Sequence, residues 1–124
     1  MEDVVDVLVV DDNEVLRTSW SVILRDVGLR VGEAADGFGA LEMLRRVPVA
    51  SMVLDIFMPG LDGFGVLDRL DDPPPVILVS GTESEAKLVA RRDKIHSFIL
   101  KPVTPDELIV AVASALGSAR ASGT

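Results

Sequence analysis

The chain has 124 residues, the size of one ordinary domain, and its 48% content of hydrophobic residues excludes an intrinsically disordered chain, because such chains lack the apolar surface that offsets the entropy cost of folding. Twenty acidic against twelve basic residues leave a formal net charge of -8, which repels nucleic-acid phosphates and anionic membrane surfaces, so we expect neither direct nucleic-acid binding nor membrane association. The absence of cysteine and the single histidine exclude disulfides, thiolate metal sites and imidazole clusters, which leaves carboxylate, hydroxyl and amine chemistry.

Five short apolar runs, in which valine and isoleucine are frequent, predict five β-strands in chain order. They cover residues 4–10, 29–32, 51–54, 76–79 and 97–100. Helical segments lie between them, and the apolar faces of the first two are Leu16, Trp20, Ile23, Leu24 and Val27, then Leu41, Leu44 and Val47. Because parallel strands need crossover connections that shield both sides, this alternation predicts a parallel sheet with helices on both faces.

Capping residues mark where several helices begin. Asp36 can cap the second helix. Thr82 with Glu85, and Thr104 with Glu107, have the spacing of a capping box, and the second pair encloses a proline suited to a first helical turn. These pairs predict the starts of the fourth and fifth helices.

Three prolines at 73–75 cannot be helical and separate the third helix from the fourth strand. The last residues are small and polar. We therefore expect one folded domain at 1–117 and a flexible C-terminal tail or linker stub at 118–124.

Three carboxylates follow strands that a parallel sheet would bring together. Asp11 and Asp12 stand at the end of the first strand, and Asp55 stands at the end of the third. Ligands of doubly wound sheets bind at the carboxyl ends of strands, where the strand order reverses. The alternative is that these aspartates are solvated loop residues, but three together favour a site for Mg²⁺, which prefers oxygen ligands.

A lysine and a hydroxyl end two other predicted strands. Lys101 follows the fifth strand, and Ser80 ends the fourth with Gly81 beside it. A lysine can pair with a phosphoryl oxygen, a hydroxyl can donate to another, and glycine leaves room for a phosphoryl donor. The site is therefore suited to phosphoryl chemistry.

Four motifs in this order resemble the receiver domain of two-component response regulators over nearly the whole chain. They are DD at 11–12, VLDIFMPGLDG at 53–63, VSGT at 79–82 and LKP at 100–102. The resemblance implies a flavodoxin-like doubly wound (βα)5 sandwich, in which the five parallel strands have the order 2-1-3-4-5.

The resemblance also implies a role for each matching residue. Asp55 would be the phosphoacceptor and Lys101 the phosphate partner. The switch would consist of the Ser80 hydroxyl and the aromatic ring of Phe98. Mg²⁺ would be held by Asp55, by Asp12 directly, by Asp11 largely through water, and by the backbone carbonyl of Phe57.

The function implied by the resemblance is a phosphorylation-dependent signalling switch. The phosphoryl group would come from a phosphohistidine on a sensor histidine kinase or phosphotransfer protein, and an effector or output domain would respond. Such a receiver modifies itself and is not a turnover enzyme. A homodimer through the face of the fourth helix, fifth strand and fifth helix is possible. The acidic N-terminus and the lack of a run of roughly 18 apolar residues favour a cytoplasmic protein.

Three alternatives use the same fold or chemistry. A Mg²⁺ phosphatase with an aspartate nucleophile would need a second aspartate where Phe57 stands. An FMN carrier would need a phosphate-binding loop in place of the acidic residues after the first strand. A pseudo-receiver that only binds partners would not need the full set of site residues.

A basic cluster, consisting of Lys87, Arg91, Arg92 and Lys94, interrupts the acidic chain. It is either a solvated helix face with internal ion pairs or a docking surface for an output. The residues Lys94 and Ile95 replace a Gly-Ala pair that is frequent in the family, which leaves the length of the fourth helix open.

Overall fold

Five parallel strands form one sheet in this protein, whose structure is a computed structural model that describes residues 4–81 and 85–122. The strands are β1 (Val7–Val10), β2 (Val31–Ala34), β3 (Met52–Asp55), β4 (Val76–Ser80) and β5 (Ser97–Leu100). Their order is β2-β1-β3-β4-β5, and each neighbouring pair is parallel. The predicted doubly wound sheet and its strand order are confirmed.

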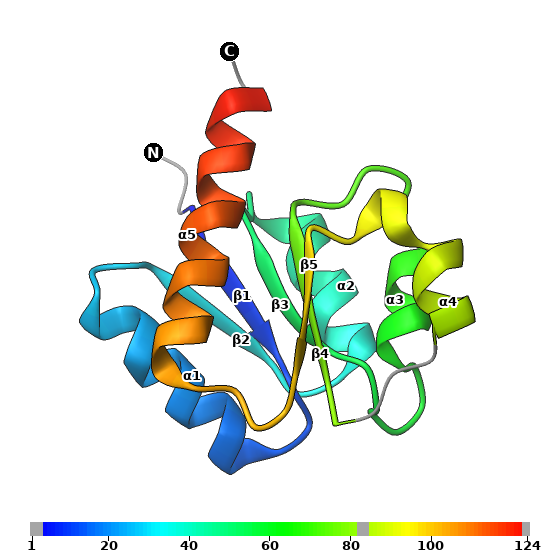
Figure 1. Cartoon of the computed structure of the whole chain (residues 1–124), viewed down its shortest axis with the longest axis horizontal. Helices are drawn as coiled ribbons and strands as arrows, with labels where there is room; N and C mark the ends of the chain where they lie inside the picture. Colours follow the sequence, from blue (N-terminus) through cyan, green and yellow to red (C-terminus); the bar gives the residue numbers. More distant parts are fainter. Residues whose placement is uncertain (1–3, 82–84, 123–124) are drawn as a thin grey trace.

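The crossover helices cover both faces of the sheet. They are α1 (Glu14–Asp26), α2 (Gly37–Arg46), α3 (Gly63–Asp68), α4 (Glu85–Ala90) and α5 (Pro105–Ser122), with a 3₁₀ turn, η1 (Arg92–Lys94), after α4. Figure 1 shows α1 and α5 on one face and α2, α3 and α4 on the other. None of the helices in the described ranges is long and apolar enough to span a membrane.

Successive side chains of the inner strands enter two different cores, since side chains alternate between the faces of a sheet. Val7 and Val9 of β1 pack in a cluster with Trp20 of α1 and with residues of α5. Leu8 and Val10 pack in the other cluster, with residues of α2 and α3. Burial on both faces is why these strands are apolar at nearly every position.

The helix caps agree with the sequence where they are described. The Asp36 carboxylate accepts a hydrogen bond from the Gly39 amide at 2.6 Å, and the Thr104 hydroxyl accepts one from the Glu107 amide at 3.1 Å. Both predicted caps are confirmed. The predicted cap at Thr82 lies outside the described residues.

Some predicted boundaries are wrong. The first strand is predicted at 4–10, whereas β1 begins only at Val7. The second strand is predicted at 29–32 but runs from Val31 to Ala34, because its register is set by pairing with β1, with Val7 opposite Val31. Val27 is predicted on the buried face of the first helix, but α1 ends before it and its side chain is 49% exposed.

The last helix, α5, continues to Ser122. The predicted bounds of the folded domain, 1–117, stay a prediction. The flexibility of 118–124 stays a prediction.

Candidate functional site

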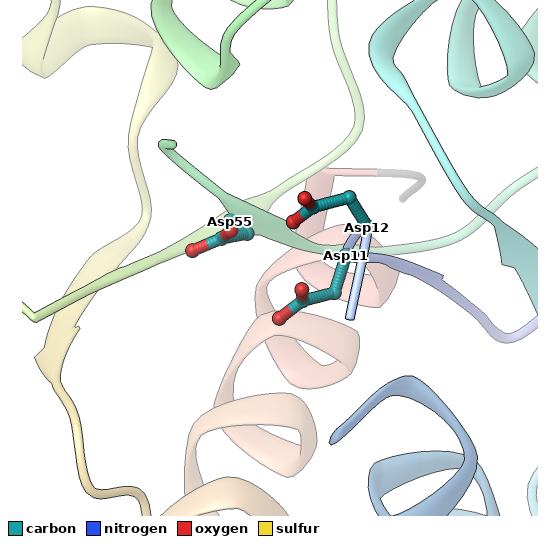
Figure 2. A group of neighbouring side chains, drawn as sticks. All are labelled: Asp11, Asp12 and Asp55. Carbon is teal, nitrogen blue, oxygen red and sulfur yellow. The ribbon is translucent and has the colours of Figure 1, made fainter. Parts of the chain in front are cut away.

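The ends of β1 and β3 bring three carboxyl groups together, as the sequence predicts. Asp11 directly follows β1, Asp12 comes next, and Asp55 is the last residue of β3. The two strands are neighbours, with Val10 opposite Leu54. One oxygen from each carboxylate lies within 4.8 Å of the other two. Figure 2 shows the three side chains side by side at these strand ends.

The loop between β1 and α1 is held in place by hydrogen bonds to Asp11. The Asn13 amide donates to Asp11 Oδ1 at 2.8 Å, and the Asn13 side chain caps α1. Arg17 Nη1 donates to the Asp11 carbonyl at 2.8 Å, while Arg17 Nε pairs with Glu33 of β2 at 3.2 Å. Sequence reasoning missed Arg17, because nothing in its spacing links it to a residue six positions earlier or to Glu33.

The segment after Asp55 is positioned by two glycines with different roles. Gly60 has a φ of +81°, which favours glycine and allows the loop to turn. Gly63 donates its amide to the Ile56 carbonyl at 2.7 Å, and a Cβ at this position would lie 2.5 Å from the Asp55 carbonyl oxygen. Gly63 therefore allows the start of α3 to approach the end of β3 closely.

Lys101 and Ser80 complete the predicted set at the same edge of the sheet. Lys101 Nζ lies 3.1 Å from Asp55 Oδ1 and 3.5 Å from Asp11 Oδ2. The Lys101 amide donates to the carbonyl of Ser80, the buried last residue of β4, at 2.8 Å. The structure thus brings Asp11, Asp12, Asp55, Ser80 and Lys101 to one end of the sheet.

Negative charge exceeds positive charge among these groups. Burial raises the pKa of Asp55 from 3.8 to about 6, with a further increase from Asp11, a partial decrease from Lys101 and a smaller increase from Asp12. Asp11 Oδ2 is buried without a hydrogen-bond donor, because the Lys101 contact at 3.5 Å is an ion pair without hydrogen-bond geometry. A buried carboxylate oxygen without a donor fits a further cation, and an all-oxygen set suits Mg²⁺.

The two phenylalanines of the predicted set differ in burial. The Phe57 side chain is 62% exposed, and the metal-binding role of its carbonyl stays a prediction. Phe98 is half-buried, packs against the core on the α2 and α3 face, and lies opposite Leu78 in β4. Since side chains alternate along a strand, Ser80 and Leu78 lie on the same face of the sheet as Phe98.

The basic cluster is tied to α3. Arg91 forms two hydrogen bonds of 2.8 Å with the Asp68 carboxylate and lies 4.7 Å from the centre of the Phe64 ring. Lys87 also lies over that ring, at 5.8 Å, and Lys94 Nζ donates to the Leu67 carbonyl at 3.0 Å.

Neither interpretation of the basic cluster made from the sequence included these contacts. α4 is a helix of 6 residues followed by η1, and the basic side chains connect this segment to α3. The hydrogen bonds from Arg91 hold the pKa of Asp68 below its ordinary value of 3.8.

We expect Arg91→Ala to loosen α4 without disturbing the carboxylate cluster. Amide hydrogens of α4 should exchange about two- to fivefold faster, as expected for the loss of a partly exposed ion pair. Hydrogen exchange measured by mass spectrometry checks this, with Arg92→Ala as the control because Arg92 is exposed. Equal exchange in the two variants would contradict the role of the Arg91 pair.

Comparison with known proteins gives one family. The family model described as "Response regulator receiver domain" matches residues 7–113. A putative response regulator, NtrX-like, from Rickettsia bellii is 35% identical over 112 residues, which are 86% of this chain and 23% of that protein. A protein-glutamate methylesterase/protein-glutamine glutaminase 1 from Anaeromyxobacter dehalogenans is 43% identical over 95 residues, 75% of this chain and 27% of that protein.

The fold comparison agrees. The crystal structure of a CheY-like response regulator receiver domain protein from Methanospirillum hungatei has a TM-score of 0.83 and 25% identity, covering 92% of this chain and 95% of that one. The chain spans about a quarter of the two curated relatives.

Proposed function

The chain belongs to the response regulator receiver family of two-component systems, and from this premise we propose that it is a switch driven by phosphorylation of Asp55. The observation that carries the proposal is the placement of the buried Asp55 carboxylate, 3.1 Å from Lys101 Nζ and beside Asp11 and Asp12. A phosphoryl group on Asp55 would meet the lysine on one side and the acidic pair on the other.

In the proposed reaction, an Asp55 oxygen attacks the phosphorus of a phosphohistidine. The new P–O bond forms as the P–N bond breaks, and the bonding electron pair stays on the imidazole nitrogen of the donor. A pKa of about 6 leaves Asp55 mostly ionised at neutral pH, yet more basic than an ordinary aspartate. Lys101 would pair with the phosphoryl oxygens once the Asp55 carboxylate is phosphorylated and has lost its own negative charge.

The carboxylates suit a bound Mg²⁺ for this chemistry. Asp12, Asp55, the Phe57 carbonyl and, largely through water, Asp11 would hold the ion. When bound, Mg²⁺ supplies positive charge against the phosphoryl oxygens. Asp11 Oδ2, buried without a donor, supports this assignment.

The sequence of the loop after β3 favours this function over the phosphatase alternative. A phosphatase of the aspartate-nucleophile type would use a second carboxyl group two positions after Asp55, and the exposed ring of Phe57 stands there. The complete set of site residues disfavours a pseudo-receiver.

The proposed partners follow from the same role. The phosphoryl donor would be a sensor histidine kinase or phosphotransfer protein in the cytoplasm, and an output domain or effector would read the switch. A homodimer could form over β5 and α5, where Leu100 is 49% and Val110 67% exposed beside a groove of about 490 Å³.

The test of the proposed function is chemical phosphorylation. With acetyl phosphate and MgCl₂, the intact mass of the protein should increase by a single phosphoryl group, and hydroxylamine should remove it, because an acyl phosphate is cleaved by this nucleophile whereas a phosphoserine is not. No mass increase, or one that resists hydroxylamine, would contradict the proposal.

We further propose that Ser80 transmits the modification to Phe98, since both side chains lie on one face of the sheet at neighbouring positions. Ser80→Ala should still accept phosphate, but its phosphorylation-dependent NMR shift changes around Phe98 should fall by more than about half. Ser19→Ala, on the surface of α1, is the control. Wild-type shift changes in Ser80→Ala would contradict the coupling.

A further inference from the structure

We infer that Trp20 is a positioning residue for Lys101, holding the lysine ammonium over the carboxylate cluster through the face of its indole ring. Lys101 Nζ lies 5.8 Å from the centre of the Trp20 ring, within the range of a cation–π contact. The inference rests on the proposed function, because that function gives Lys101 its task.

The alternation of side chains along β5 explains why Lys101 lies on the face of the sheet that Trp20 of α1 covers. Ile99 of β5 packs in the same core cluster as Trp20, on the face covered by α1 and α5. Lys101 is two positions further along, so its side chain continues on that face. Val53 belongs to the same cluster and precedes Asp55 by two positions, which places the phosphoacceptor on the same side.

The indole ring is a rigid support for a flexible side chain. Trp20 is only 4% exposed and is locked in the core, whereas the Lys101 side chain is 26% exposed and ends in a freely rotating ammonium group. The carboxylates of Asp55 and Asp11 attract this group but change their charge or partners when a phosphoryl group or metal ion binds. The ring has no charge to neutralise, so its attraction for Lys101 persists through these changes.

Different substitutions at Trp20 separate its packing in the core from its positioning of Lys101. Packing alone would require only a large apolar side chain, whereas positioning requires an aromatic face, which phenylalanine also provides and leucine does not. Leu24 provides a matched control, since it is fully buried one turn along the same helix and packs in the same cluster.

The first arm of the test measures the rate at which acetyl phosphate with MgCl₂ phosphorylates each folded variant, followed by intact mass. Trp20→Leu should be about two- to fivefold slower than wild type, as expected for the loss of a cation–π contact. Trp20→Phe should retain most of the rate, and Leu24→Val should react as wild type does. A wild-type rate in Trp20→Leu, or equal losses in the phenylalanine and leucine variants, would overturn the inference.

The second arm leaves Trp20 in place and needs no phosphorylation. Trp20 is the only tryptophan of the chain, so the tryptophan emission comes from the ring that faces Lys101. Lys101→Met should change the emission intensity or maximum, and Lys87→Met, on α4, should not. Identical spectra for wild type and Lys101→Met, or equal changes in both methionine variants, would overturn the inference. Failure of wild type to accept phosphate would instead contradict the proposed function, and the emission arm would still decide the contact.

Discussion

Asp55→Asn is expected to abolish phosphoryl uptake, reducing it to the background of the assay. The amide matches the carboxylate in shape, so the end of β3 and the contact with Gly63 should be retained, but it is a poor nucleophile. Intact-mass measurement after incubation with acetyl phosphate and MgCl₂ checks this result.

Asp72→Asn is the matched control for this substitution. It makes the same chemical change at an exposed aspartate between α3 and β4, outside the carboxylate cluster, and should be phosphorylated as wild type is. A hydroxylamine-sensitive phosphoryl group on Asp55→Asn would show that another carboxylate is the acceptor.

The same Asp55→Asn substitution should stabilise the protein at pH 7 by about 3 kcal/mol in the absence of divalent cations. The raised pKa of Asp55, about 6 against 3.8, means that ionising this group is harder in the folded chain than in the unfolded chain. A pKa difference of about two units corresponds to about 3 kcal/mol of destabilisation at a pH where Asp55 is ionised in both the folded and the unfolded state. Removing the charge removes this cost.

The pH dependence has a definite sign. Between about pH 4 and 6 the folded state keeps the Asp55 proton while the unfolded state has lost it, so wild-type stability should fall as pH rises through this range. Asp55→Asn should lack this fall, and Asp72→Asn should retain it. Urea unfolding at pH 4.5 and 7 measures the difference, and equal pH dependence in wild type and Asp55→Asn would contradict the prediction.

Mg²⁺ should reduce the destabilisation that the ionised Asp55 causes in wild type. A cation bound by Asp11, Asp12 and Asp55 favours the ionised form, so saturating MgCl₂ should stabilise wild type more than Asp55→Asn and narrow the gap between them at pH 7. An unchanged gap would mean that the ion binds elsewhere.

Local patterns in the sequence were sufficient to predict the parallel sheet and the residues at the centre of the site. Apolar runs alternating with helical segments predict parallel strands, and a polar residue at the end of such a run must lie at the carboxyl edge. Asp11, Asp55, Ser80 and Lys101 could therefore be placed together without coordinates. The motifs that resemble the receiver family then supplied the strand order, which periodicity alone leaves open.

The tertiary structure decided the contacts between residues that are remote in sequence. The pairing of Arg91 with Asp68, the bond from Arg17 to the Asp11 carbonyl, and the indole face under Lys101 all join different elements. The raised pKa of Asp55 likewise depends on how deeply neighbouring strands bury it. Sequence periodicity reports which face of an element is apolar, but the distance between two side chains on different elements depends on strand register and on how each helix lies over the sheet. The contacts of Asp55 with its neighbours on other strands set the electrostatics of the site, and local sequence patterns do not reveal them.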